Sequence, residues 1–252
     1  MLILYHQGIQ SKLEFIMIKL FLKVNIFITI IFTNYCFGKE FYAATEAWIP
    51  YVYQDKDNNP KGIDYFLCKK IFKSLGIDFK LDFLPWLRVL DMLKKNEKDG
   101  ILDVIKNPER EKFMIFSSRE LSTIDFAIFY KKNKPFKYEN LNSFTGKTIA
   151  IMRGYSYPKD FLEAKNFIKV DITGDSGSER NFKKLIYDRV DLVIENKTTG
   201  LQILKKLGEE KNVTLTEKSL DKLKLYLSFS MKYKNDDLVK YFNNELSKIK
   251  RN

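Results

Sequence analysis

Residues 77–105 read IDFKLDFLPWLRVLDMLKKNEKDGILDVI and predict a strand, a helix and a second strand in that order. In residues 77–83 apolar and charged side chains alternate, which is typical of a strand with one solvated face. Pro85 follows, and the apolar side chains behind it recur at helical spacing: Trp86, Val89, Leu90 and Leu93. Gly100 then begins an apolar run. The stretch therefore predicts a strand–helix–strand unit.

The flanking residues extend this unit in both directions. Upstream, residues 41–45 predict a strand, and residues 63–75 predict a helix that stops at Gly76. Downstream, Asn107 precedes Pro108 and an early acid, which is the pattern of a capped short helix. The first half of the chain therefore has the order βαβαβ.

The same order recurs later in the chain. The expected elements are a strand over 147–152, a helix from Ser156, a strand over 168–172, a helix over 179–187, a strand over 191–194 and a helix over 198–207. Two such units predict an α/β fold with two lobes, each a mostly parallel sheet flanked by helices.

Two extended segments connect these units. They are predicted over 125–130 and 223–229, and an amphipathic helix over 238–249 closes the chain. Crossings near residues 124 and 223 would let the chain leave the first lobe and return to it. We expect lobe I to comprise 39–123 and 224–252, and lobe II to comprise 124–223.

The first 38 residues predict a secretory signal peptide. Lys19 and Lys23 precede an apolar run of residues 24–32, and Cys36 and Gly38 take the small-residue positions before a cleavage site. We expect Met17, rather than Met1, to be the start of this signal peptide. Two alternatives stay open at this point: an uncleaved membrane anchor, and a lipoprotein acylated on Cys36.

Histidine and cysteine usage excludes several classes of enzyme. Among 252 residues the only histidine is His6, and the two cysteines are Cys36 and Cys68. A chain that begins at residue 39 has no imidazole and one thiol, so it has no internal disulfide, no Cys/His zinc cluster and no histidine-dependent triad. We expect no metal and no cofactor, and we expect Cys68 to be a core side chain.

The chain is strongly basic, with 44 Lys and Arg against 32 Asp and Glu and a formal charge of +12. A basic protein can bind nucleic acid or an anionic membrane. The lysines are scattered along the chain, however, so a solvated surface is the favoured interpretation. A polyanion-binding protein is kept as an alternative.

Ligands of parallel α/β sheets bind outside the carboxyl ends of the strands, which makes the residues there candidates. Arg110 follows one such end and can grip a carboxylate, and Ser156 follows another. Trp48 and Trp86 also lie near strand ends, where they can cover a ligand. The ordinary alternatives are an ion pair for Arg110, a helix cap for Ser156 and core packing for the tryptophans.

Several segments together resemble the family 3 extracellular solute-binding proteins, the polar-amino-acid receptors of ABC importers. The resemblance covers about residues 40 to 250, in family order. It rests on 45–53, 62–64, 83–88, 107–110 through 116–117, 146–154 and 189–194. It implies a type II periplasmic binding protein-like fold.

The resemblance also implies roles for individual residues. Trp48 would stack on the ligand, Arg110 would bind its α-carboxylate, and Ser156 would meet the same carboxylate. The family's ammonium-binding Asp corresponds to Asn196 here, so Asp103 or Glu195 would have to supply the negative charge.

A second hypothesis concerns the sign of the ligand's charge. Arg88, Arg110 and Arg153 all facing the cleft would favour an anionic ligand over a zwitterion. A preference for basic amino acids would contradict it.

We therefore expect a monomeric periplasmic protein that binds a small carboxylate-bearing solute, an amino acid or a relative, and delivers it to an inner-membrane ABC permease. No nucleic acid is expected as a partner. The alternatives are an enzyme on the same scaffold, similar to cyclohexadienyl dehydratase, in which Asp103, Glu195 or Glu46 would do acid–base work, and a sensory ligand-binding module.

Overall fold

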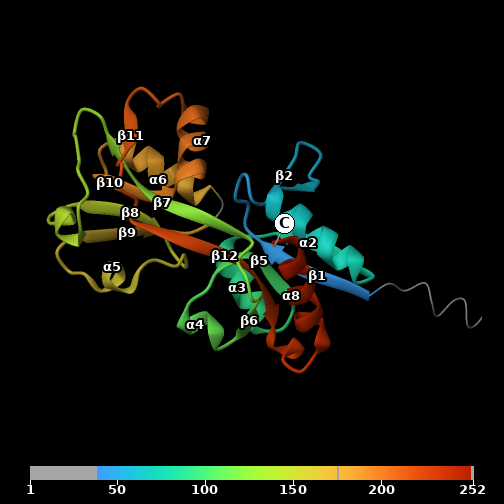
Figure 1. Cartoon of the computed structure of the whole chain (residues 1–252). Coiled ribbons are helices and arrows are strands. Elements are labelled where there is room, and N and C mark those ends of the chain that lie inside the picture. Colours follow the sequence, from blue (N-terminus) through green and yellow to red (C-terminus); the bar gives the residue numbers. More distant parts are fainter. Residues whose placement is uncertain (1–38, 175, 251–252) are drawn as a thin grey trace, which may run out of the picture. The chain divides into compact units, whose positions relative to one another are not determined.

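Figure 1 shows a computed structural model of the chain, which describes residues 39–174 and 176–250. The predicted signal peptide, residues 1–38, lies outside the described residues. The strands are β1 (Lys39–Thr45), β2 (Tyr53–Gln54), β3 (Pro60–Lys61), β4 (Ile77–Phe83), β5 (Gly100–Ile105), β6 (Met114–Phe116), β7 (Ser122–Lys131), β8 (Thr148–Met152), β9 (Ile168–Ile172), β10 (Leu192–Asn196), β11 (Val213–Leu215) and β12 (Asp221–Ser230). The helices are α2 (Ile63–Ser74), α3 (Trp86–Lys94), α4 (Pro108–Glu111), α5 (Lys159–Glu163), α6 (Gly177–Ile186), α7 (Lys197–Leu207) and α8 (Asp237–Ile249), with 3-10 turns η1 (Leu141–Phe144) and η2 (Met231–Tyr233).

Both predicted βαβαβ units are present, as β1-α2-β4-α3-β5 and β8-α5-β9-α6-β10. The strand order of the main sheet is β4-β1-β5-β12-β7-β10-β8-β9, with β6 beside β12 and β11 beside β7. β1 and β5 are parallel, and so are β10, β8 and β9. We call β4-β1-β5 and its helices the first half, and β10-β8-β9 and its helices the second half.

The two halves are joined by the long strands β7 and β12, which run through the centre of Figure 1. Asp221–Leu225 of β12 pairs with Ser122–Phe126 of β7, while residues 225–229 of β12 pair with β5 and residues 228–230 pair with β6. The far end of β7 pairs antiparallel with β10. The crossings expected near residues 124 and 223 therefore pair with each other. The sequence predicted two separate sheets, but this pairing merges them into one, since central strands satisfy their backbone groups on both edges.

Local sequence explains most of the element boundaries. β4 and β9 have the predicted bounds, and Pro85 precedes the first turn of α3. One helix differs from the prediction, because α5 begins at Lys159 and not at Ser156. The residue before a proline is pushed away from helical geometry, and Pro158 holds its neighbour Tyr157 out of the helix in this way.

Phenylalanine rings form the core of the first half. Phe72 of α2 stacks on Phe41 at 4.5 Å and on Phe79 at 5.0 Å between ring centroids. Phe242 of α8 lies 5.3 Å from Phe72, so the last helix packs on α2, as Figure 1 shows. Cys68 is fully buried in this core, and burial raises the pKa of its thiol well above the usual range. The thiol is therefore protonated and packs as a small apolar side chain.

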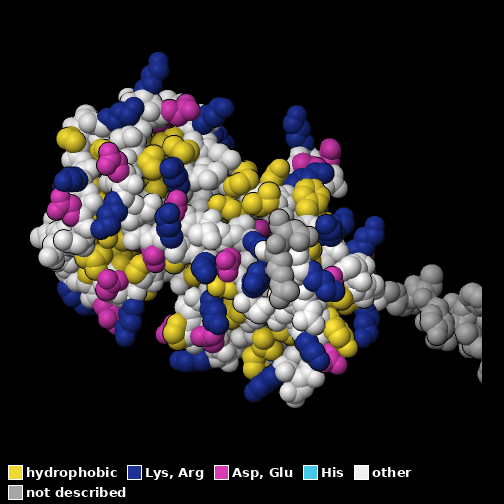
Figure 2. Space-filling model, in the orientation of Figure 1, with side chains coloured by type: hydrophobic (Ala, Val, Ile, Leu, Met, Phe, Trp, Pro, Cys, Tyr) yellow, Lys and Arg dark blue, Asp and Glu magenta, His cyan; other side chains and the backbone are white. Residues whose placement is uncertain are grey.

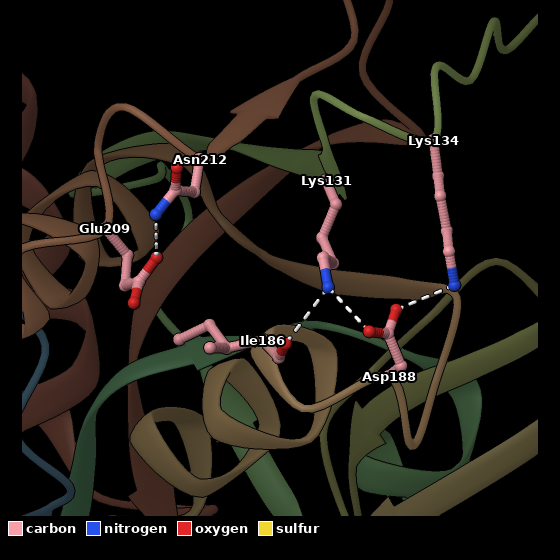
Figure 3. A network of polar contacts seen from close by, with 6 residues as sticks. All are labelled: Lys131, Lys134, Ile186, Asp188, Glu209 and Asn212. Atoms are coloured by element: carbon pink, nitrogen blue, oxygen red, sulfur yellow. Dashed lines mark hydrogen bonds and ion pairs between the residues drawn. The ribbon is translucent and has the colours of Figure 1, made fainter.

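The surface carries its charges without segregation. Figure 2 shows Lys and Arg spread over the visible face with Asp and Glu between them. Figure 3 shows one local network, in which Lys131 and Lys134 both donate to Asp188 at 2.7 Å and tie β7 to the end of α6. Within the described residues, no helix is both long and apolar enough to cross a membrane.

Candidate functional site

Two neighbouring cavities lie at the carboxyl ends of β1, β5 and β8. The smaller, which we call the Arg110 chamber, has a volume of about 20 Å³. The larger, which we call the large cleft, has a volume of about 510 Å³. The Arg110 chamber is lined by Thr45, Glu46, Trp48, Trp86, Asp103, Ile105, Arg110, Tyr155 and Ser156. The large cleft is lined by Glu46, Ala47, Trp48, Ile49, Gln54 and 83–85 from the first half, and by Met152, Tyr155, 176–179, Thr199, Gln202, Ile203 and Lys206 from the second half.

The residues that line the cavities come together because they follow strands whose carboxyl ends meet at one edge of the sheet. Glu46 and Trp48 follow β1, Arg110 follows β5, and Tyr155 follows β8. The side chains that belong to both cavities are Glu46, Trp48 and Tyr155. These three residues therefore form the wall between the Arg110 chamber and the large cleft.

Arg110 is the cation of the smaller cavity. Asn107 caps α4 by accepting the Arg110 N–H at 2.9 Å, which fixes the helix and its arginine. The guanidinium is 5% exposed and donates to the carbonyls of Ile105 at 2.6 Å and Gly154 at 2.9 Å. Burial lowers the pKa of Arg110 to about 10, so it stays charged at neutral pH. None of the described carboxylates forms an ion pair with it.

Aromatic rings surround the same chamber. The Tyr155 ring lies 5.6 Å from Trp48 and 6.2 Å from Trp86, edge to face in both contacts. The Trp86 ring also lies 5.1 Å from the Arg110 guanidinium carbon, and its N–H donates to the Gly154 carbonyl at 2.7 Å. The Tyr155 hydroxyl donates to Glu46 Oε2 at 2.9 Å. Burial, together with Glu46 and Glu195, raises the pKa of Tyr155 well above its usual value, so its hydroxyl remains a donor.

Glu195 lies behind the large cleft and outside both linings. Its carboxylate accepts from the Ser178 hydroxyl and from the Asn196 backbone N–H at 2.8 Å. Burial raises its pKa to about 7, against the opposing effect of these donors. The Trp48 N–H is near enough to favour the charged form but does not meet hydrogen-bond geometry, and it is buried without a partner.

Asn196 takes a structural position. Its Oδ1 accepts from the Thr199 N–H at 3.0 Å and so caps helix α7. The side chain is 1% exposed and lines neither cavity. The structure therefore places the predicted ammonium-binding position at a helix cap.

Asp103 lines the Arg110 chamber but lies against a second carboxyl group, that of Asp64. Both side chains are buried, and Ser122 donates to Asp64 Oδ1 at 2.7 Å. Burial raises the pKa of Asp103 well above its usual value, and the Asp64 charge adds to the effect. Burial and the neighbouring Asp64 carboxyl both favour the neutral form of Asp103, so this side chain is poorly suited to supply the negative charge expected of it.

The remaining predicted residues separate into two groups. Ser156 belongs to the Arg110 chamber, where its hydroxyl accepts from Asn107 Nδ2 at 3.0 Å. Arg88 and Arg153 are exposed and line neither cavity, and Arg153 pairs with Asp171 at 2.5 Å. The hypothesis that three arginines face the cleft is therefore not carried forward, and Arg110 alone remains.

A family model described as bacterial extracellular solute-binding proteins, family 3, matches residues 42–252. The chain belongs to this family. The match confirms the resemblance found in the sequence and covers both halves of the sheet, so the two cavities belong to a family 3 solute-binding protein. A search among curated proteins found no significant match.

Solved structures similar to this family 3 solute-binding protein share its fold. Holo ArgBP from T. maritima matches with a TM-score of 0.71 and 20% identity over 84% of this chain and 90% of that chain. AbpA from Streptococcus pneumoniae, an amino acid ABC transporter substrate-binding protein bound to L-arginine, matches with a TM-score of 0.69 and 20% identity over 84% of this chain and 89% of that chain. The ancestral amino acid-binding protein AncCDT-1, a precursor of cyclohexadienyl dehydratase, matches with a TM-score of 0.67 and 18% identity over 84% of this chain and 90% of that chain. These likenesses establish the type II periplasmic binding protein-like fold that the sequence predicted.

Two residues that line both cavities escaped the sequence analysis as ligand-site candidates. Glu46 was considered only for acid–base work, and Tyr155 was not singled out. The available signal for Tyr155 was its place directly after the strand-end Gly154, where a large side chain must point either into the cleft or away from it. Sequence alone does not decide between these two directions.

Proposed function

We propose that this family 3 solute-binding protein captures a small carboxylate-bearing solute, an amino acid or a relative, in the periplasm and delivers it to an inner-membrane ABC permease. Family membership supports the binding role, and it also supports an extracellular location. The names of the similar structures, which include arginine-bound and glutamine-bound proteins, support the amino-acid class.

The observation that carries the proposal is the buried Arg110 guanidinium. Burying a cation without an anion costs free energy, so buried charges in folded proteins are normally paired. Arg110 is 5% exposed and its two hydrogen bonds go to neutral carbonyls. A solute carboxylate is the partner that such a group favours, because guanidinium and carboxylate form charge-assisted hydrogen bonds.

The same contacts support closure of two lobes around the solute. Arg110 and Trp86 belong to the first half, whereas their common acceptor Gly154 belongs to the second. We place the lobes at 39–123 with 224–252 and at 124–223, with β7 and β12 as the hinge. A solute favours closure only through contacts that are better in the closed state.

Calorimetric titration of residues 39–252 with L-amino acids and dicarboxylates tests the proposal. We expect one class of carboxylate to bind, and Arg110→Ala to weaken its affinity by about 10- to 150-fold, the value of a hydrogen bond to a charged group. Arg88→Ala is the matched control, because Arg88 is exposed and outside both cavities. Binding that ignores Arg110, or conversion of the solute during the titration, would contradict the proposal.

A further inference from the structure

Tyr155 and Arg110 line the same small chamber. Its ring contacts Trp48 and Trp86, its hydroxyl donates to Glu46, and its side chain lines both cavities. The volume that remains in the Arg110 chamber is about 20 Å³. Such a volume holds about one water molecule, and a carboxylate has three heavy atoms. Tyr155 and a solute carboxylate therefore compete for the same place.

The backbone before Tyr155 fixes this arrangement. Gly154 has φ 82°, a left-handed conformation that glycine adopts without strain. Its carbonyl accepts from both Trp86 Nε1 and Arg110 Nη2, which holds the turn against the first half. The next side chain is thereby directed between the two tryptophans.

We propose that Tyr155 is a specificity-determining residue of this solute-binding protein: it separates the Arg110 chamber from the large cleft and must leave before a solute carboxylate reaches Arg110. The inference rests on the proposed function, since it assumes that Arg110 binds the solute. With Tyr155 displaced, the two cavities join through their common wall. The joined site accepts a solute that spans from Arg110 past Glu46 into the large cleft. It rejects solutes whose contacts are too few to offset the free energy needed to move Tyr155.

The displacement sets the expected size of the effect. When only a fraction of the molecules is competent to bind, the apparent dissociation constant rises by the inverse of that fraction. Moving Tyr155 breaks a hydrogen bond to a carboxylate and two aromatic contacts. The hydrogen bond alone corresponds to about 10- to 150-fold in the equilibrium between the two positions of Tyr155.

The test compares Tyr155→Ser, Tyr155→Phe and the wild-type chain by calorimetry with L-arginine, L-glutamine, L-glutamate and succinate. Tyr155→Phe keeps the ring and its two aromatic contacts but loses the bond to Glu46, so we expect it to bind a carboxylate about 10- to 150-fold more tightly than the wild type. Tyr155→Ser also loses the aromatic contacts, so we expect a larger gain and the acceptance of smaller acids. Tyr187→Ser is the matched control, because Tyr187 is 69% exposed and lines neither cavity. Adding Arg110→Ala to Tyr155→Ser should abolish the gain.

A second measurement needs no solute. Trp48 and Trp86 are the two tryptophans of the chain, and both contact Tyr155. Quenching of their fluorescence by acrylamide should increase in Tyr155→Ser and stay at the wild-type level in Tyr187→Ser. Unchanged quenching in a folded Tyr155→Ser protein would show that Tyr155 does not shield the two tryptophans from solvent, and it would contradict the proposal.

The outcomes separate the inference from the proposed function. If the wild type binds a carboxylate through Arg110 and Tyr155→Ser binds it no more tightly, the inference is wrong and the proposed function stands. If no variant binds any carboxylate in a manner that depends on Arg110, the proposed function fails and the inference fails with it.

Discussion

Glu195 carries a pH dependence that follows from its burial. Its pKa rises from 4.5 to about 7 on folding, so the folded protein binds this proton more tightly than the unfolded chain does. A raised carboxyl pKa means that its contribution to stability is full below pH 4.5 and is lost as the pH rises to 7. At 1.36 kcal/mol per pKa unit the loss is about 3 kcal/mol.

We therefore predict that Glu195→Gln removes part of the alkaline loss of stability. Urea unfolding at pH 5 and pH 8 should show a smaller difference in the free energy of unfolding for Glu195→Gln, by about 2 to 3 kcal/mol, because part of the loss has already occurred at pH 5. Glu163→Gln, at an exposed and ion-paired carboxylate, is the control and should behave as the wild type does. An identical pH slope in both variants would show that Glu195 ionises normally.

The buried Asp64–Asp103 pair also lowers the stability of the fold as the pH rises, and its contribution can be tested separately from that of Glu195. Asp103 has φ 62°, which asparagine tolerates well, and its carboxyl is held neutral. Asp103→Asn should change the free energy of unfolding at pH 5 by no more than about 1 kcal/mol, and it should reduce the loss of stability at pH 8. Asp91→Asn on the exposed face of α3 is the control. A large loss at both pH values would mean that the charged form of Asp103 is needed.

The sequence predicted part of the candidate site. The periodicity of the helix and the strand explains why Arg88 and Arg153 lie outside it. Trp48, Trp86, Arg110 and Ser156 meet at one chamber, as expected from the strand ends, and Asp103, which was considered as a source of negative charge, lines it too. The expectation that Arg88 and Arg153 also face the cleft did not take the direction of their side chains into account. Arg88 lies two positions after the inward-facing Trp86 on a helix, and such positions do not share a face. Arg153 directly follows the buried Met152 at a strand end, where neighbouring side chains point to opposite faces.

At the scale of elements, the capped helix α4 connects stability to binding. Asn107 accepts the Arg110 N–H and donates to Ser156, which lies in the second half. We predict that Asn107→Ala lowers the free energy of unfolding by about 0.5 to 2 kcal/mol, as loss of a cap does, and also weakens solute affinity because Arg110 is less well placed. Thermal melts and calorimetry measure the two effects.

Asn140→Ala is the matched control for this prediction. Asn140 caps the turn η1, which lies outside both cavities, so its loss should affect stability alone. Equal losses of affinity in the two variants would contradict a positioning role for Asn107.

Short elements were the ones that the sequence did not reveal. β2 and β3 have two residues each, and β6 and β11 have three. Periodicity needs several residues to distinguish a strand from a loop, so these strands exist through pairing with neighbours and not through their own pattern. The longer elements, such as β4 and α3, were predicted because their apolar spacing repeats.

At the scale of the whole fold, β7 and β12 are the elements that the sequence described least well. Their extended character was predicted, but their pairing with each other was not, since strand pairing is a non-local contact. Asp221–Leu225 meets Ser122–Phe126 across about a hundred residues of chain. This pairing is what makes one sheet of the two predicted sheets.

Gly154 links the two halves and provides the last test. A Cβ at this position would lie 2.4 Å from Leu87 Cδ2 and 3.2 Å from Trp86 Cδ1, in addition to the cost of φ 82°. We predict that Gly154→Ala forces the turn away from α3, breaks the hydrogen bonds of Trp86 and Arg110 to the Gly154 carbonyl, and increases the radius of gyration measured by small-angle scattering. Gly208→Ala separates the backbone cost from this contact, because Gly208 has φ 71° and nothing within 4 Å of the added carbon. Both variants should lose stability by about 1 kcal/mol or more from the left-handed backbone, but only Gly154→Ala should open the two halves. An unchanged radius of gyration in Gly154→Ala would show that the exposed Leu87 side chain moves aside and that the turn keeps its place against α3.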